Sequence, residues 1–206
     1  MLSSEATIEG KETLRNFLYN KSFAVVIGDN DSGKTTLVRY LVNGVPKNKV
    51  FILNSSGQKW DYPKKNIFRP KMYSTEWFNQ FIVWFAGCHS NCTLILDDAD
   101  SFKVKDNAYL NTVIQLARHS NIGIILSLRM MQDVDRVLYK QAKLYVGTQY
   151  VSYDVIYLSR TIGQVAEKVA TLPKFVFFNW YRHESRLFKV PTDFAMRWKA
   201  FTEAKK

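Results

Sequence analysis

The sequence predicts an α/β protein with a mostly parallel sheet covered by helices on both faces, followed by a C-terminal β-hairpin and helix. Two observations support this fold class. Apolar runs of strand length alternate with segments of helical period along the chain. A glycine-rich loop separates the first apolar run from a helical segment, as in a strand–loop–helix unit. With 206 residues, 47% of them apolar, the chain is large enough for one domain with a sizeable core.

In the first half of the chain, these periods predict three helices and three strands. One helix is expected at residues 5–19 and another at Gly33–Val42, directly after the glycine-rich loop. Ser74 is expected to cap the third helix. Residues 57–72, which contain two prolines, are expected to be irregular. The third helix is expected to carry an aromatic row on one face: Trp77, Phe81, Trp84 and Phe85. The strands are expected at Phe23–Gly28, Lys49–Leu53 and Thr93–Leu96.

The second half of the chain continues the alternation of strands and helices and then ends in a predicted hairpin and helix. Asp106 is expected to cap a helix that runs through Ala117. The strands expected here are Ile122–Leu128, Lys143–Val146, and a hairpin of Phe175–Trp180 with Arg186–Val190 around the turn Tyr181–Ser185. A last helix is expected from Thr192. We therefore expect a single domain over residues 1–206, with an N-terminal helix in 1–20, a core in 21–150, and C-terminal helices and a hairpin in 151–206.

The loop between the first strand and the next helix has the pattern of a phosphate-binding loop. Gly28 to Thr35 is Gly-Asp-Asn-Asp-Ser-Gly-Lys-Thr, which matches G-x-x-x-x-G-K-[ST]. Phosphate oxygens need several converging N–H donors, and glycines let the backbone approach them closely. The helix that follows directs its free N–H groups and the positive end of its dipole to the same place. A chance match is the alternative, but the position between a strand and a helix argues against it.

The residues of this loop can be given separate roles toward ATP. Lys34 is expected to neutralise β- and γ-phosphate oxygens, the Thr35 hydroxyl to bind Mg²⁺, and Thr36 to reach the α-phosphate. Asp29 and Asp31 carry negative charge next to a triphosphate, so we expect their side chains to point to solvent. The residues expected to contact the nucleotide are Gly28, Asp31, Ser32, Gly33, Lys34, Thr35 and Thr36.

A second site feature is the pair of carboxylates that ends the strand at Thr93–Leu96. Asp97 is expected to coordinate Mg²⁺, as in a Walker B strand. Asp98 is expected to face the γ-phosphate, where it polarises or deprotonates the attacking water. Two Asp residues in a strand-end turn are common without any such role. Beside a phosphate loop, the pair favours hydrolysis of the nucleotide over transfer of its phosphate to a small acceptor, because a second carboxylate suits attack by water.

Taken together, these residues resemble the FtsK–HerA superfamily of P-loop ATPases. More closely, they resemble the genome-packaging NTPases of archaeal turreted icosahedral viruses, which contain double-stranded DNA and an internal membrane. The resemblance covers about residues 20–150 and implies a RecA-like P-loop NTPase core. The segment Ala117–Leu126 narrows the resemblance from P-loop proteins in general to this superfamily. In that segment an arginine ends a helix and is followed by a short turn and an apolar strand, as in the superfamily. By this resemblance Arg118 acts in trans, as a finger on the nucleotide of a neighbouring subunit.

The chain departs from the family pattern at two positions. The second carboxylate is usually Glu, whereas this chain has the shorter Asp98. The fourth strand usually ends in a Gln that senses the γ-phosphate, and Arg129 occupies that position here, with Gln132 three residues later. We expect Arg129 to be the sensor, with Gln132 as the alternative. If Arg118 is only a favourable charge at a helix end, the residue acting in trans would be sought among Arg129, Arg136 and Arg160.

Charge and resemblance together indicate the partners. The formal net charge of +11 favours a polyanion, nucleic acid before membrane. The resemblance implies an ATP-driven motor that packages double-stranded DNA, works as a homo-oligomeric ring (a hexamer), and contacts a capsid or membrane component. Neither a signal peptide nor an apolar run long enough to span a bilayer is visible, so we expect the host cytoplasm, and the virion vertex during packaging.

Two basic segments are candidate DNA contacts. Gly57–Met72 interleaves five Lys and Arg residues with Trp60, Tyr62 and Phe68, so cations could meet phosphates while aromatic rings rest on sugars or bases. Lys103 and Lys105 follow the acidic strand. The alternative for both is a solvated basic loop whose aromatic residues fold back on the core.

Two other functions stay open at this point. A small P-loop kinase would transfer phosphate to a small acceptor, and Arg160 and Arg182 are candidates for its arginine-rich lid. A DNA-binding virion component with a merely structural nucleotide site conflicts with the intact set Lys34, Thr35, Asp97 and Asp98.

Overall fold

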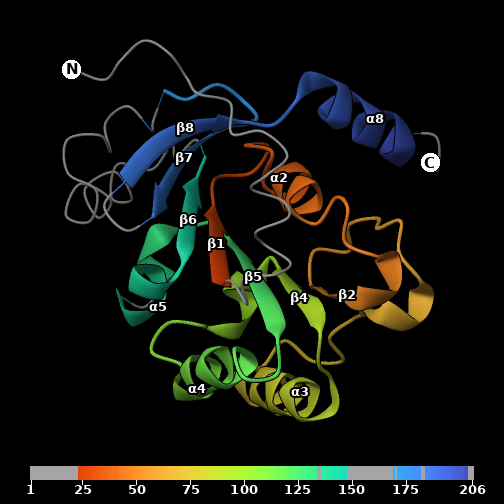
Figure 1. The fold of residues 1–206 in the computed structure, drawn as a ribbon, viewed down its shortest axis with the longest axis vertical. Helices are drawn as coiled ribbons and strands as arrows, with labels where there is room; N and C mark the ends of the chain where they lie inside the picture. The colour runs from red at the N-terminus through yellow and green to blue at the C-terminus, as the bar shows by residue number, and fades with distance from the viewer. Residues whose placement is uncertain (1–22, 134–135, 148–168, 170, 182–183, 204–206) are drawn as a thin grey trace.

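An eight-stranded sheet forms the centre of the computed structural model, which describes residues 23–133, 136–147, 169, 171–181 and 184–203 (Figure 1). The order across the sheet is β3-β2-β4-β5-β1-β6-β7-β8. The first six of these strands are parallel, and β7 and β8 extend the sheet as an antiparallel hairpin. The strands are β1 Phe23–Ile27, β2 Val50–Asn54, β3 Ile67–Phe68, β4 Cys92–Asp97, β5 Ile122–Leu128, β6 Lys143–Val146, β7 Val176–Tyr181 and β8 Glu184–Lys189. The predicted mostly parallel sheet with a closing hairpin is confirmed.

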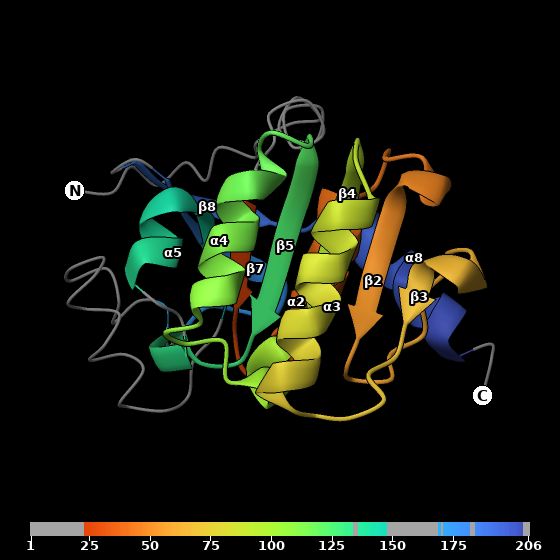
Figure 2. The ribbon, with the colours of Figure 1, turned by 90° about the horizontal axis from the view of Figure 1, so that it is seen from below.

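Helices cover both faces of the sheet, as predicted (Figures 1 and 2). The helices α3, α4 and α5 pack on one face, and α2 and α8 pack on the other. Alternate residues of β1 serve the two layers, since Val25 packs with α3 and α4 whereas Ala24 and Val26 pack with α2. The helices are α2 Lys34–Leu41, α3 Thr75–Cys88, α4 Ala108–Ala117, α5 Arg136–Gln141 and α8 Thr192–Glu203. Short 3₁₀ turns are η1 Lys47–Lys49, η2 Lys64–Asn66, η3 Ala99–Phe102 and η4 Met131–Asp133.

The start of α3 and its aromatic face both match the prediction. The Ser74 hydroxyl accepts a hydrogen bond from the Trp77 backbone N–H at 3.2 Å and caps the helix. The predicted aromatic row is confirmed, because the Phe81 ring lies 5.5 Å from the Trp77 ring and 5.9 Å from the Trp84 ring. Trp84 lies at the outer margin of this row, with 47% of its surface exposed. The residues of α3 that are buried are Phe78, Phe81, Ile82 and Phe85.

The cap of α4 lies one residue later than predicted. Asn107, and not Asp106, precedes the helix, and its Oδ1 accepts a hydrogen bond from the Leu110 N–H at 3.0 Å. Asp106 instead adopts a left-handed backbone with φ of 55°. Asn107 Nδ2 also donates to Asn79 Oδ1 at 2.8 Å, so the same side chain starts α4 and ties it to α3.

Two expected regions need comment. The segment 57–72 was predicted to be irregular, but it contains the short strand β3, which pairs in parallel with β2. Two residues are too few to show a strand period in a sequence. The helix predicted at residues 5–19 and most of the region 148–170 lie outside the described residues. Among the helices that are described, none combines the length and apolar character needed to cross a bilayer.

Candidate active site

The carboxyl ends of three adjacent parallel strands bring most of the predicted site residues together. In the sheet, β5 lies between β4 and β1. The loop Gly28–Gly33 follows β1, Asp97 ends β4, and Arg129 follows β5. Because these strands are parallel, all three segments lie at the same edge of the sheet, where open α/β sheets bind their ligands.

Lys34 is the first residue of α2 and is held against the loop that precedes it. Its side chain is buried, and its Nζ donates hydrogen bonds to the carbonyl oxygens of Gly28 at 2.6 Å and Asp29 at 3.0 Å. Burial lowers the pKa of the Lys34 ammonium, while the carboxylates of Asp98 and Asp100 raise it. Phosphate oxygens accept stronger, charge-assisted hydrogen bonds than neutral carbonyls do, so a bound phosphate would compete for this ammonium.

Both glycines of the loop have close neighbours, and the backbone conformation of Gly33 also favours glycine. Gly33 has φ of 97°, and a Cβ there would lie 2.5 Å from the Phe175 ring. A Cβ at Gly28 would lie 2.5 Å from the Ser32 hydroxyl. The backbone N–H of Phe175 donates to the Ser32 carbonyl at 3.1 Å. A residue from the start of the C-terminal hairpin therefore braces the loop, a contact that the motif does not reveal.

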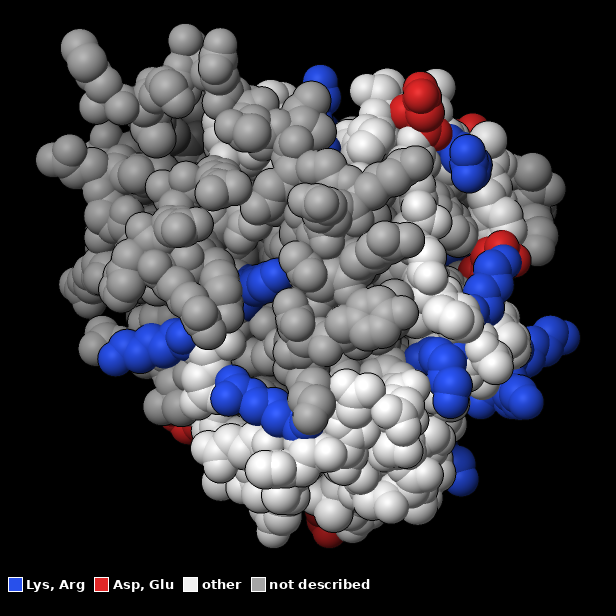
Figure 3. Space-filling model, viewed as in Figure 1, with Lys and Arg blue, Asp and Glu red and all other residues white. Residues whose placement is uncertain are grey.

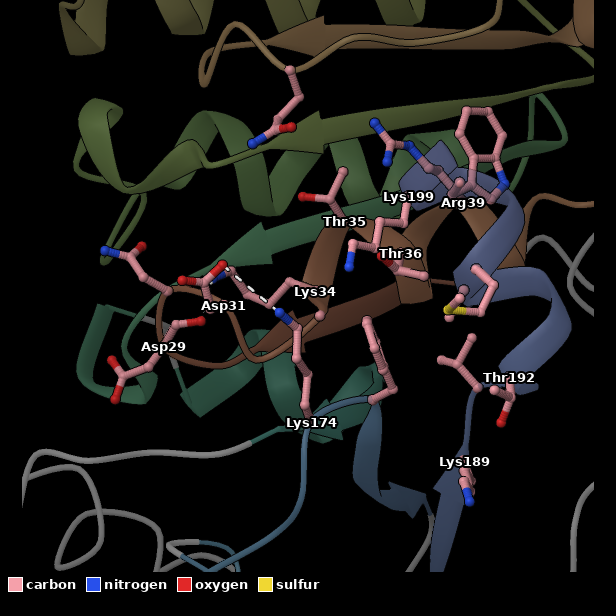
Figure 4. A pocket seen from close by; sticks show the side chains of 18 of the residues that line it. Asp29, Asp31, Lys34, Thr35, Thr36, Arg39, Lys174, Lys189, Thr192 and Lys199 are labelled. Carbon is pink, nitrogen blue, oxygen red and sulfur yellow. Dashed lines mark hydrogen bonds and ion pairs between the residues drawn. The ribbon is translucent and has the colours of Figure 1, made fainter. Parts of the chain in front are cut away.

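The N-terminus of α2 is open toward the loop. Gly33 is its N-cap and supplies no side-chain hydrogen bond, and the first turn contains no acidic residue. Its N–H groups therefore have no side-chain cap to compete with an anion. The Asp31 side chain is 97% exposed and lies 3.9 Å from Lys174 Nζ, consistent with the expectation that it points away from the loop interior (Figure 4).

Asp97 is completely buried, with 0% of its surface exposed. Its Oδ2 accepts a hydrogen bond from the Ser56 hydroxyl at 2.9 Å, and its Oδ1 has no hydrogen-bond partner among the described residues. Burial, with a further contribution from Asp98, raises the pKa of the Asp97 carboxyl to about 7. A buried carboxylate oxygen without a partner is costly unless a cation or donor is supplied. Its chemistry fits Mg²⁺, a hard cation that prefers oxygen ligands.

The chain turns sharply after Asp97. Asp98 has φ of 50°, in the left-handed region, and its side chain lines the cavity described below. The short η3 turn then brings Asp100 back to β5, where its Oδ1 accepts a hydrogen bond from the Arg129 N–H at 2.8 Å. Its Oδ2 is buried without a partner among the described residues, and burial raises the pKa of the Asp100 carboxyl. The sequence analysis missed Asp100, although it is the third acid in four residues.

Arg129 and Gln132 occupy different places. Arg129 follows β5 directly, and β5 pairs in parallel with β1, so Arg129 lies beside the phosphate loop that follows β1. Its charge contributes to lowering the Lys34 pKa. Gln132 lies in η4, where its Nε2 contacts Met130 Sδ at 3.2 Å. The position immediately after the strand thus belongs to Arg129, as the sequence analysis expected, while its role as a sensor stays a prediction.

Arg118 lies at the amino ends of the strands, opposite the carboxyl ends that carry the phosphate loop. It is the C-cap of α4, just before β5 begins, and its Nη2 donates to Gln141 Oε1 at 3.3 Å. Seven residues of β5 separate that edge from Arg129, which is about 20 Å at the usual rise per strand residue. Arg118 is therefore remote from the phosphate loop of its own chain. Of the other candidates for a role in trans, the Arg136 side chain and all of Arg160 lie outside the described residues, as does the suggested lid residue Arg182.

A cavity of about 430 Å³ extends from the phosphate loop to the C-terminal helix (Figure 4). At one end it is lined by the loop, Thr35, Thr36, Gln58 and Asp98. It is also lined by residues that the sequence analysis did not assign to the site: Arg39, Lys174, Phe175, Lys189, Val190, Thr192, Ala195, Met196, Trp198 and Lys199. The sequence predicted the hairpin and the last helix, which supply most of these residues, but nothing in the sequence indicated that they lie beside the loop.

The basic segment Gly57–Met72 is exposed only in part. Trp60 is buried and its ring lies against the Arg39 guanidinium, while Phe68 packs on Phe51 and Phe81. Its aromatic residues thus fold back on the protein, the second of the two alternatives above, and are not available to stack on DNA bases. The exposed cations of the segment are Lys59, Lys64, Lys65, Arg69 and Lys71. Figure 3 shows several Lys and Arg side chains on this side of the molecule, where β2 and the loop after it lie in Figure 1.

The second basic segment alternates in burial. Phe102 and Val104 are buried, and Lys103 and Lys105 between and after them are exposed. Lys103 has φ of 50° and ends η3, so the two lysines project close to the acidic turn.

The comparisons with known proteins agree with this geometry. A family model described as an AAA domain matches residues 15–138. The fold is similar to that of B204, the DNA-packaging ATPase from Sulfolobus turreted icosahedral virus, with 20% identity over 83% of this chain and 98% of that chain, and a TM-score of 0.69. The genome-packaging NTPase B204 from Sulfolobus turreted icosahedral virus 2, in complex with ATPγS, gives 19% identity, 84% and 99% coverage, and a TM-score of 0.68.

A more distant likeness is to the N-terminal domain of zonular occludens toxin from Neisseria meningitidis, with 12% identity, 85% and 97% coverage, and a TM-score of 0.50. No curated protein matches the chain in sequence. At these identities the solved structures establish the fold, and that fold is the P-loop NTPase type that the sequence predicted.

Proposed function

The chain belongs to the AAA domain family, and on that premise we propose that it is an ATP-hydrolysing motor that translocates double-stranded DNA, most specifically for packaging a viral genome. The observation that carries this proposal is the cavity at the carboxyl edge of the sheet. It joins the open N-terminus of α2 and the loop before it to the acidic turn at Asp98. The similarity in fold to the B204 packaging NTPases supports the same function.

Nucleotide binding would use the groups that the loop already exposes. The N–H groups at the start of α2 would donate to phosphate oxygens, and Lys34 would exchange its two carbonyl acceptors for β- and γ-phosphate oxygens. The Thr35 hydroxyl and the Asp97 carboxylate would hold Mg²⁺, which when bound neutralises charge on the phosphates. Thr36 would reach the α-phosphate.

Hydrolysis would depend on the acidic turn and the end of β5. Asp98 lines the cavity and would orient the attacking water and accept its proton. Arg129 would report the presence of the γ-phosphate from the neighbouring strand end. Asp100 holds the Arg129 backbone through its hydrogen bond, so the acidic turn and the sensor position would move together.

The complete site would need a second subunit. Arg118 lies at the edge of the sheet opposite its own phosphate loop, which suits a residue offered to a neighbour. In a homo-oligomeric ring, expected to be a hexamer, each Arg118 would stabilise charge on the phosphoryl group bound by the next subunit. An isolated subunit would then hydrolyse ATP slowly.

DNA binding would come from the exposed cations. The formal net charge is +11, and the described lysines of the Gly57–Met72 segment and of Lys103–Lys105 project from the surface. Contacts of this kind recognise phosphates and do not distinguish one base sequence from another, which is what a packaging motor requires. The motor would act in the host cytoplasm and at a virion vertex, where a capsid or membrane component would dock it.

The decisive experiment measures phosphate release from ATP with and without duplex DNA over a range of protein concentrations, with Lys34→Ala as the inactive control. Turnover per subunit should rise with protein concentration and rise further with DNA. A small-molecule kinase would instead transfer phosphate to an acceptor and ignore DNA. Turnover that responds to neither DNA nor concentration would refute the motor.

A further inference from the structure

One buried cation links the helix of the phosphate loop to the basic segment Gly57–Met72. We propose that Arg39 is a positioning residue that couples nucleotide binding at the loop to DNA binding at this segment, and that it acts through Trp60. The inference rests on the proposed function, since it takes the loop to bind a nucleoside triphosphate and the segment to bind DNA. It goes beyond that function because it names the contact through which the two sites influence each other.

Arg39 belongs to the helix that starts at the phosphate loop. It follows Lys34 by five residues on α2 (Figure 4), which is about 7–8 Å along the helix axis. Its side chain is only 4% exposed and lines the same cavity as the loop. When phosphates replace the two carbonyl partners of Lys34, the start of α2 adjusts. A short helix moves as one rigid element, so this adjustment also moves Arg39.

The guanidinium of Arg39 contacts the basic segment at Trp60. It lies 4.9 Å from the centroid of the Trp60 ring, and its Nη2 donates a hydrogen bond to the Lys59 carbonyl at 2.5 Å. Trp198 of α8 packs on the same guanidinium, with its ring centroid at 4.6 Å. A planar guanidinium stacks on aromatic rings and donates in fixed directions. These contacts therefore hold the backbone at Lys59 and Trp60 in place relative to α2.

The burial of Arg39 is energetically unfavourable by itself. Its Nε has no hydrogen-bond partner among the described residues, and neither of the ion pairs found between described side chains includes it. A buried cation without a carboxylate partner usually contributes less to stability than an apolar residue of similar volume. Methionine would anchor the segment at least as well, so stability alone does not account for an arginine at this position.

The backbone that Arg39 holds leads directly to exposed cations. Lys59 is exposed beside the buried Trp60, and the exposed Lys64 and Lys65 follow in η2. Phosphates of DNA bound by these cations would act on the same backbone. Coupling through a contiguous set of packed contacts is reciprocal, so DNA changes the nucleotide affinity by the same factor as the nucleotide changes the DNA affinity.

The test measures this factor as the ratio of the Kd values for the nucleotide analogue AMPPCP without and with saturating duplex DNA. Calorimetry with the full chain and Mg²⁺ gives both values, at one fixed salt concentration because phosphate contacts depend strongly on salt. In wild type the two Kd values should differ by at least about fivefold. Arg39→Met leaves an unbranched side chain between the two rings and removes the charge and the donors, so its ratio should fall to about one.

Two further variants keep the test independent of how well Arg39→Met folds. Trp60→Leu removes the stacking ring from the other side of the contact, and it should also bring the ratio to about one. Asp61→Asn is the matched control, since it removes the exposed ion pair with Lys47 at 2.6 Å and leaves Arg39 in contact with Trp60. Asp61→Asn should keep the wild-type ratio. Thermal melting of each variant identifies a purely structural role, in which Tm falls and the ratio does not change.

Several results would overturn the inference. A wild-type ratio in Arg39→Met or in Trp60→Leu would show that coupling takes another route, and it would leave the proposed motor intact. An equal loss in Asp61→Asn would show that any loosening of the segment abolishes coupling, with no separate role for Arg39. A ratio of one in wild type would refute the coupling while both binding activities stand. If wild type fails to bind AMPPCP or duplex DNA, the proposed function fails together with the inference.

Discussion

Replacing Arg118 with alanine separates a structural role of this residue from a catalytic one. In the structure Arg118 is exposed and ends α4, and its side chain donates a hydrogen bond to Gln141 at 3.3 Å. An exposed hydrogen bond and a charge at a helix end together contribute about 2 kcal/mol or less to stability. In a domain of this size, that corresponds to a fall in Tm of about 4–8 °C at most.

The role in trans predicts a much larger effect on the reaction. An arginine finger accelerates phosphoryl transfer by about 10³–10⁵, which is about 4–7 kcal/mol of transition-state stabilisation. Arg118→Ala should therefore lose most of its turnover while it still binds ATP and melts within a few degrees of wild type. Gln141→Ala is the matched control, since it removes the same hydrogen bond and leaves the guanidinium. That variant should keep wild-type turnover.

The assay is steady-state ATP hydrolysis under conditions that favour assembly, first with each variant alone and then with mixtures. Arg118→Ala and Lys34→Ala subunits should each be inactive. Mixed in equal amounts they should recover part of the activity, because a subunit with an intact loop can receive Arg118 from a Lys34→Ala neighbour. Wild-type turnover by Arg118→Ala, or mixtures as inactive as their components, would show that Arg118 is only a helix-end charge.

Three other variants test the acidic turn and the proposed DNA contacts. Asp98→Asn should bind ATP normally and hydrolyse it at least about 100-fold more slowly, because the amide cannot accept a proton from water; normal turnover in the same assay would place the base elsewhere. Asp100→Ala removes the acceptor for the Arg129 N–H, so turnover should fall with little change in the Kd for ATP, and a loss confined to thermal stability would contradict a positioning role. Charge reversal of Lys64 and Lys65 should weaken duplex binding equally for all sequences and reduce its salt dependence by about two phosphate contacts. Unchanged DNA affinity in a salt titration would move the DNA path away from this segment.

Much of the fold and one end of the site could be predicted from short stretches of sequence. The phosphate loop from Gly28 to Thr35 is contiguous, and its strand and helix are its immediate neighbours, so the local pattern contains the whole unit. Asp97 was placed at the same edge because parallel strands carry their carboxyl ends to one side. The strands predicted from apolar runs at Ile122–Leu128 and Lys143–Val146 have the same bounds as β5 and β6 in the structure.

The sequence was ambiguous where two residues or two environments were equally suitable. Asp106 and Asn107 are both good N-caps, and the backbone conformation selected Asn107. For Trp60 the sequence left two alternatives open, contact with DNA or packing on the core, and the structure placed its ring against the Arg39 guanidinium.

The sequence by itself predicted the phosphate end of the site and fixed its local structure, because the loop, its strand and its helix are adjacent in the chain. The tertiary structure alone decided the rest. It set Phe175 against Gly33, the Asp100 carboxylate on the Arg129 N–H, and the residues of α8 along the cavity. These contacts join segments separated by 29 to more than 140 residues. Sequence periodicity reports which face of an element is apolar, and it carries no record of which distant element will pack there.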